Sequence, residues 1–160
     1  MEILNKIGIY CMRNKESIAV AESVTAGTIQ TLISNGKDAK KFFHGGMTAY
    51  NTAQKTRHLN VEPISAENCN AVDVDIAIQM AKAVSRMFCS TIGLASTGYA
   101  APYPERDVRT PFAYLAIVQR GEVLFADKVV PDSQNFGLEI QQEYAERILH
   151  ILWEKITDGD

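Results

Sequence analysis

Residues 17–27 read Ser-Ile-Ala-Val-Ala-Glu-Ser-Val-Thr-Ala-Gly and lead directly into the amphipathic segment 28–33. This order, an apolar run, a polar corner and an amphipathic segment, predicts a buried strand that turns into a helix. In open α/β sheets ligands bind at the carboxyl ends of strands, where a helix N-terminus offers unpaired N–H groups. We therefore expect Ser23 and Thr25 to lie where an anion or a developing oxyanion can bind. Ser and Thr are also preferred N-cap residues, so helix capping without a ligand remains an alternative.

The rest of the chain alternates helical and strand patterns around this corner. Apolar spacing predicts helices over 2–14, 28–33, 51–59 and 73–88, and from 133 or 135 to 156, and strands over 42–50, 91–96, 112–119 and 122–130. Asn51 and Asp73 are the predicted N-caps of the third and fourth of these helices. Arg120-Gly121 is typical of a two-residue hairpin, which makes at least one strand pair antiparallel. The pattern predicts helices on both faces of a mixed sheet, in one domain over 1–160. The irregular loop 99–110 has the length of a functional loop.

Composition and charge exclude several classes of protein. With 46% hydrophobic and 22% charged residues the chain is of the globular type, and its net charge of -3 argues against a nucleic-acid binder. The three cysteines have no metal-ligand spacing, so we expect no metal site and interpret all three as small apolar fillers in a reducing compartment. The first residues do not resemble a signal peptide, and no apolar run approaches the ~18 residues of a membrane span. We therefore expect a cytoplasmic protein with no membrane partner.

Three predicted strand ends carry small or polar residues, at 23–27, 45–50 and 97–98. If these strands are parallel neighbours, their loops converge at one edge of the sheet. Ser23, Lys55 and Tyr50 are the candidates for catalysis there, because a serine hydroxyl needs a base, and a lysine serves as one when burial keeps it neutral. Tyr50 would relay a proton or hold the geometry. The structural alternatives are a solvated Lys55 and a Thr97 that only ends a strand.

Several short motifs follow one another along nearly the whole chain. They are Ala-Glu-Ser-Val-Thr-Ala-Gly at 21–27, Gly-Gly-x-x-x-Tyr-x-x-x-x-Lys at 45–55, Ala-Val at 71–72 followed by Met-Ala at 80–81, and Thr-Gly-x-Ala-Ala-Pro at 97–102. On these motifs the chain resembles the CinA C-terminal family (competence/damage-inducible protein), whose stand-alone members are nicotinamide mononucleotide amidohydrolases. The resemblance implies a three-layer α/β/α sandwich with a mixed, mainly parallel sheet.

The resemblance also implies a reaction and a set of site residues. Ser23 would attack the nicotinamide carboxamide with help from Lys55 and Tyr50, ammonia would leave, and water would release nicotinate mononucleotide. No metal or organic cofactor is implied, the partner is a small-molecule nucleotide, and a homo-oligomer is expected. Backbone N–H groups around 23–27 would serve the oxyanion, and the expected substrate-binding residues are Thr25, Ala26, Gly27, Gly46, Thr97, Gly98 and Arg109.

The chain also departs from the family pattern. Val24 replaces a Cys, and Ala26, Ala101 and Phe112 replace glycines. The family's Gly-Asp-Arg near the start of the last helix is Gly-Leu-Glu at 137–139, so Glu139 replaces a cation. Its loss would weaken binding of a phosphorylated substrate or leave the pKa of Lys55 less perturbed. Arg106 or Arg109 could reach in instead. A second hypothesis is therefore a catalytically silent CinA-like domain that binds a nucleotide or a protein partner.

Overall fold

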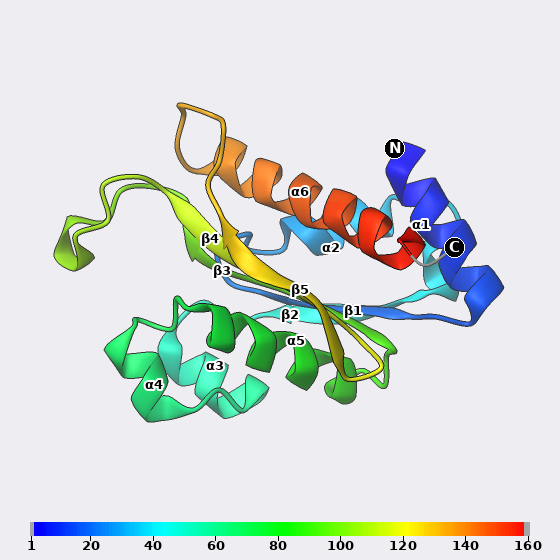
Figure 1. The fold of residues 1–160 in the computed structure, drawn as a ribbon, viewed down its shortest axis with the longest axis horizontal. Helices are drawn as coiled ribbons and strands as arrows, with labels where there is room; N and C mark the ends of the chain where they lie inside the picture. Colours follow the sequence, from blue (N-terminus) through cyan, green and yellow to red (C-terminus); the bar gives the residue numbers. More distant parts are fainter. Residues whose placement is uncertain (1, 159–160) are drawn as a thin grey trace.

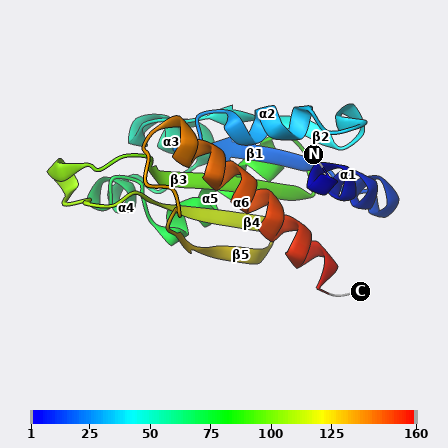
Figure 2. The same cartoon turned by 90° about the horizontal axis from the view of Figure 1, so that it is seen from above.

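The sheet of the protein has the strand order β2-β1-β3-β4-β5 in the computed structural model, which describes residues 2–158 (Figures 1 and 2). The strands are β1 (Ile18–Glu22), β2 (Phe43–Thr48), β3 (Ile92–Tyr99), β4 (Phe112–Gln119) and β5 (Glu122–Val129). Strand β1 pairs in parallel with β2 and β3, whereas β4 pairs antiparallel with β3 and β5. The predicted mixed sheet is confirmed, and only β4 runs against the other four strands.

Helices cover both faces of this sheet and complete the three layers (Figure 1). One face carries α1 (Glu2–Asn14), α2 (Thr28–Ser34) and α6 (Leu138–Thr157), and the other carries α3 (Thr52–Leu59), α4 (Pro63–Asn68) and α5 (Val74–Met87). Two short 3-10 helices, η1 (Ala39–Lys41) and η2 (Pro104–Arg106), lie in the connections. The expected α/β/α sandwich is therefore the observed architecture.

The two faces of β1 differ in side-chain size. Ile18 and Val20 contribute to the core under α1, α2 and α6, whereas the alanines between them contact the α5 side. Small residues let α5 lie close to the sheet, so close that a Cβ added at Gly93 of β3 would come within 2.1 Å of the Ala81 carbonyl oxygen. Only glycine fits at that position without moving the helix.

Strand β3 is longer than the sequence predicted. It extends to Tyr99, so Thr97 and Gly98 lie within the strand and pair with Tyr114 and Ala113 of β4. Pairing with β4 supplies hydrogen bonds for residues that local propensity assigned to a turn. The long loop after β3 also has structure, because it contains η2 and an isolated bridge between Tyr103 and Val108.

The last helix starts later than predicted, at Leu138 rather than at 133 or 135. The amide N–H groups of Asp132 and Ser133 donate to the carboxylate of Glu143, which holds the chain outside the helix. Of the cysteines, Cys11 is buried, but Cys89 is exposed, so the interpretation of all three as core fillers was wrong.

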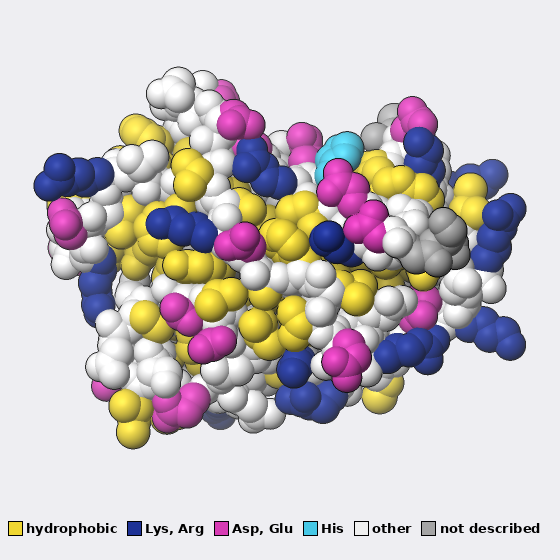
Figure 3. All heavy atoms as spheres, in the orientation of Figure 1, with side chains coloured by type: hydrophobic (Ala, Val, Ile, Leu, Met, Phe, Trp, Pro, Cys, Tyr) yellow, Lys and Arg dark blue, Asp and Glu magenta, His cyan; other side chains and the backbone are white. Residues whose placement is uncertain are grey.

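On the face drawn in Figure 3, hydrophobic side chains gather in a band between α6 and α5, where the edge strand β5 lies. Val123 of this strand is exposed, and Phe125 is partly buried. In residues 2–158, no helix is both long enough and apolar enough to span a bilayer. The expected homo-oligomer stays a prediction.

Candidate active site

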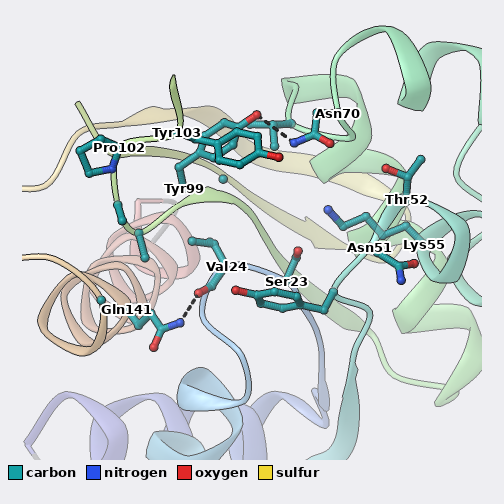
Figure 4. Close-up of a pocket in the computed structure, with 16 residues that line it drawn as sticks. Ser23, Val24, Asn51, Thr52, Lys55, Asn70, Tyr99, Pro102, Tyr103 and Gln141 are labelled. Carbon is teal, nitrogen blue, oxygen red and sulfur yellow. Dashed lines mark hydrogen bonds between the residues drawn. The ribbon is translucent and has the colours of Figure 1, made fainter. Parts of the chain in front are cut away.

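A cavity of about 480 Å³ lies at the carboxyl ends of β1 and β3 and beside the start of α3 (Figure 4). The strands that precede its loops, β1, β2 and β3, are adjacent and parallel, as the hypothesis of converging strand ends required. The lining residues come from the ends of β1, β2 and β3, from α3, from the connection between α4 and α5, and from the start of α6: Ser23, Val24, Tyr50, Asn51, Thr52, Lys55, Asn70, Val72, Gly98, Tyr99, Ala100, Ala101, Pro102, Tyr103, Gly137 and Gln141.

Ser23 directly follows β1 and is only 5% exposed. Its amide N–H donates to the Ser96 carbonyl oxygen at 3.0 Å, which fixes the backbone against β3. Its side chain lines the cavity (Figure 4), and within residues 2–158 no hydrogen bond involves its Oγ atom. The hydroxyl is thus held in place through its backbone and remains available to a ligand.

Lys55 reaches the cavity from the first turns of α3. Asn51 caps this helix as predicted, because its side chain accepts a hydrogen bond from the amide N–H of Gln54. The lysine is 3% exposed, and burial lowers the pKa of its amine from 10.5 to about 8, since a charged amine is poorly solvated there. The alternative of a solvated Lys55 is therefore wrong.

The amine of Lys55 is held by two oxygens. It donates to Thr97 Oγ1 at 3.0 Å and to the Ala71 carbonyl oxygen at 3.4 Å. Thr97 Oγ1 itself donates to the Ala71 oxygen at 2.6 Å, so towards the lysine it can act only as an acceptor. A neutral amine has two N–H bonds, and with both directed to these oxygens its lone pair is left to accept a proton. Thr97 thus positions Lys55 and does not itself line the cavity.

Glu22 caps helix α2, the role that the sequence suggested for the hydroxyls of Ser23 and Thr25. Its buried carboxylate accepts the amide N–H groups of Gly27, Ile29 and Gln30 at 2.9 to 3.1 Å, at the N-terminus of α2. Neither serine nor threonine caps the helix, because Thr25 is fully buried and shares a 2.6 Å hydrogen bond with Ser96 Oγ. An anion therefore cannot use these helix N–H groups without displacing Glu22.

Two other N–H groups of the corner remain without an acceptor in the described part of the chain. They belong to Val24 and Thr25, which directly follow the serine. The Val24 carbonyl oxygen accepts Gln141 Nε2 of α6 at 2.9 Å, so this segment is tied to a second helix. Val24 lines the cavity, whereas Thr25 is fully buried and does not, so the Val24 amide is the donor of this corner suited to an oxyanion.

Aromatic side chains form another part of the cavity wall. Tyr99 and Tyr103 stack with ring centroids 5.7 Å apart, and Asn70 Nδ2 donates to Tyr99 Oη at 3.1 Å (Figure 4). Tyr50 also lines the cavity but is 68% exposed. The sequence identified Tyr50 and missed Asn70, Tyr99, Tyr103 and Gln141. Asn70 and Gln141 follow no predicted strand, and the two tyrosines lie in the long loop 99–110, where no local pattern shows which side chains turn towards the cavity.

Of the expected substrate-binding residues, Gly98 lines the cavity and the others do not. Ala26 and Gly27 form a left-handed turn with φ of 48° and 103°. Gly46 is in close contact with β1, because a Cβ there would come within 2.3 Å of the Val20 carbonyl oxygen. The side chain of Arg109 is 89% exposed and pairs with Asp107 at 3.7 Å, away from the cavity lining.

The position of the family's cation also lies outside the cavity wall. Glu139 bonds through its carboxylate to Ser133 Oγ and Asn135 Nδ2 and is not among the lining residues. Within residues 2–158, no three His, Cys, Asp or Glu side chains are arranged to hold a metal ion.

Comparison with known proteins gives a consistent result. A family model described as the CinA C-terminal domain matches residues 2–156. The chain is 34% identical over 122 residues to a CinA-like protein of Dictyoglomus thermophilum, covering 74% of this chain and 29% of that protein. A putative competence-damage inducible protein of Moorella thermoacetica is 28% identical over 141 residues, covering 88% of this chain and 33% of its own length. The chain thus matches about a third or less of these relatives.

Solved structures share the fold at low identity. The competence damage-inducible protein A of Klebsiella pneumoniae has a TM-score of 0.91 at 19% identity, covering 99% of this chain and 98% of its own. The competence/damage inducible protein CihA of Agrobacterium tumefaciens has a TM-score of 0.84 at 21% identity, covering 98% and 94%.

Proposed function

The chain belongs to the CinA C-terminal domain family, and from this premise we propose that it is a serine-lysine amidohydrolase acting on nicotinamide mononucleotide or a related amide. The products would be the carboxylate, here nicotinate mononucleotide, and ammonia. One observation carries the proposal: a buried lysine of lowered pKa lines the same cavity as a serine whose hydroxyl has no hydrogen-bond partner in residues 2–158. Perturbed titratable groups in a cavity are typical of catalytic sites.

The reaction follows from these two side chains. Neutral Lys55 takes the hydroxyl proton as Ser23 Oγ attacks the amide carbon, and the negative charge that forms on the amide oxygen is stabilised by the N–H group of Val24. Collapse breaks the C–N bond, and the protonated lysine gives its proton to the departing ammonia. Water then attacks the acyl-serine ester, again with Lys55 as base, and releases the acid and the free serine.

In the described residues no hydrogen bond joins Lys55 Nζ to Ser23 Oγ, so the proton passes through one water or after rotation of the serine side chain. Such loose contacts are common before substrate binds.

The aromatic wall supports a flat, cationic substrate ring. The nicotinamide of a mononucleotide is a pyridinium, and aromatic faces attract cations as well as flat rings. Tyr99 and Tyr103 provide such faces beside Ser23, and Tyr50 lies at the exposed side of the cavity. We therefore propose that Tyr50 acts mainly through its ring.

The test is ammonia release from nicotinamide mononucleotide. We expect the purified wild-type protein to release ammonia and both Ser23→Ala and Lys55→Ala to lose at least about 10³-fold in kcat. The exposed Ser34→Ala and Lys40→Ala provide matched controls that should retain wild-type rates. An equal background from the wild type and both site variants would reject the enzyme.

A second candidate function is a catalytically silent domain that binds a nucleotide. It is favoured by Glu139, which replaces the family's cation and lies outside the cavity lining. Calorimetric binding of nicotinamide mononucleotide to the wild-type protein, with no ammonia formed over hours, would support this function instead.

A further inference from the structure

A phosphorylated substrate needs a place for its phosphate, and the serine cavity offers a poor one. Among its described lining residues, Lys55 is the only cation. A phosphate dianion beside this amine would favour the charged lysine and raise its pKa, which would weaken it as a base. The phosphate must therefore bind away from Lys55. Glu139, Arg106 and Arg109, the three positions considered from the sequence, do not line the cavity either.

A second hollow, of about 530 Å³, adjoins the serine cavity. We call it the arginine hollow; it is lined by Thr52, Ala53, Thr56, Arg57, Pro63, Glu67, Asn70 and Arg106. Thr52 and Asn70 line both spaces, which makes them neighbours. A ligand that extends past these two residues from the serine cavity would enter the arginine hollow.

The charge of the arginine hollow suits an anion. Arg57 of α3 and Arg106 of η2 contribute two cations against one carboxylate, that of Glu67. Neither guanidinium forms an ion pair in residues 2–158, so both are available to a ligand. Planar guanidinium groups match the oxygens of a phosphate with paired hydrogen bonds. The hydroxyls of Thr52 and Thr56 add further donors.

We propose that the arginine hollow binds the phosphate monoester of the substrate through Arg57 and Arg106, while the amide lies at Ser23. The sugar then spans the boundary at Thr52 and Asn70. The identity of the ligand rests on the proposed function, but the site does not depend on turnover. Arg106 thus takes over the role of the family's missing cation, together with an arginine that the sequence did not single out.

The test is equilibrium binding to Ser23→Ala, which cannot turn the substrate over by the proposed route. Calorimetry would compare nicotinamide mononucleotide with nicotinamide riboside, the same amide without its phosphate. We expect Arg57→Gln and Arg106→Gln each to weaken binding of the mononucleotide about 10-fold and to leave the riboside unchanged, as expected for a lost charged hydrogen bond. Glu67→Gln should strengthen mononucleotide binding about 3-fold. Arg86→Gln, an exposed change on α5, is the matched control.

Each result supports or overturns the proposal. The proposal is overturned if the mononucleotide and the riboside bind equally well to Ser23→Ala, or if the mononucleotide does not bind at all. It is also overturned if both arginine variants leave the affinity for the mononucleotide unchanged. If the arginine variants weaken only mononucleotide binding but the wild type releases no ammonia, the phosphate site stands and the amidohydrolase is rejected. The binding assay thus tests the phosphate site, and ammonia release tests the amidohydrolase independently of it.

Discussion

Replacing Lys55 with methionine should abolish the proposed amide hydrolysis and stabilise the fold. Burial lowers the pKa of this amine from 10.5 to about 8, and at about 1.4 kcal/mol per pKa unit the buried charge costs about 3 kcal/mol at neutral pH. Methionine has a similar unbranched shape and removes the charge. The change loses the hydrogen bond to Thr97 and the longer one, of 3.4 Å, to the Ala71 oxygen, together worth about 1 kcal/mol, but Thr97 keeps its own bond to Ala71. We expect Lys55→Met to be about 2 kcal/mol more stable at neutral pH.

The pH dependence of this difference follows from the direction of the pKa change. Below about pH 8 the lysine is charged in both the folded and the unfolded wild-type protein, so the full penalty is present. Between about 8 and 10.5 the unfolded state binds more protons than the folded state, so the stability of the wild type rises with pH. The advantage of Lys55→Met should therefore shrink across this range and vanish near about pH 9.5. Above about pH 10.5 the wild type should be more stable by about 1 kcal/mol, because only its extra hydrogen bonding then distinguishes the two proteins.

The measurement is urea unfolding followed by circular dichroism at several pH values, with the exposed Lys40→Met as control. At neutral pH we also expect a Tm about 5 °C higher for Lys55→Met. A variant that is less stable than the wild type at neutral pH, by an amount that does not change up to pH 10.5, would refute the inference of a buried, destabilised charge.

Three further predictions follow from the same residues. The kcat/KM for amide hydrolysis should fall about 10-fold per pH unit below the Lys55 pKa of about 8, since only the neutral amine accepts a proton; a flat profile from about pH 6 to 9 in a steady-state assay would exclude Lys55 as the base. Glu22→Ala should lower the free energy of unfolding in urea by at least about 3 kcal/mol, because three amide donors lose their acceptor. The control Glu146→Ala, on the surface, should lower it by less than about 0.5 kcal/mol, and similar losses in both variants would contradict the capping role. Ala26→Gly should raise the free energy of unfolding by about 0.5 to 1 kcal/mol, because Ala26 has a φ of 48°; a loss of stability in the same assay would show that the left-handed turn is not strained.

Much of the architecture could be predicted because local patterns agree with the final packing. The caps at Asn51 and Asp73 were predicted from single residues and are confirmed, since each side chain accepts a backbone N–H within its own first turn. The family resemblance is confirmed by the family model. The predicted boundaries of an element were wrong where contacts with residues distant in sequence determine them. In β3, pairing with β4 extends the strand through Thr97 and Gly98.

The site could be predicted only in part, for a related reason. Ser23 and Lys55 were singled out correctly as neighbours of one cavity, but their supporting contacts are distant in sequence. Thr97 meets Lys55 across 42 positions, and no local pattern encodes that contact. Glu22 carried a usable signal, because it alternates with Ile18 and Val20 and so faces the side that α2 covers.

The carboxylate of Glu22 has a consequence for how substrate is recognised. Because it already satisfies the amides at the start of α2, the corner that carries Ser23 is ordered without help from a ligand. Because the loop is already ordered, ligand binding does not have to offset the entropy lost on ordering it. The free energy of binding is then more favourable than it would be for a flexible site. Amide hydrogens of Gly27, Ile29 and Gln30 should exchange slowly with deuterated solvent in the free protein and change little when ligand is added.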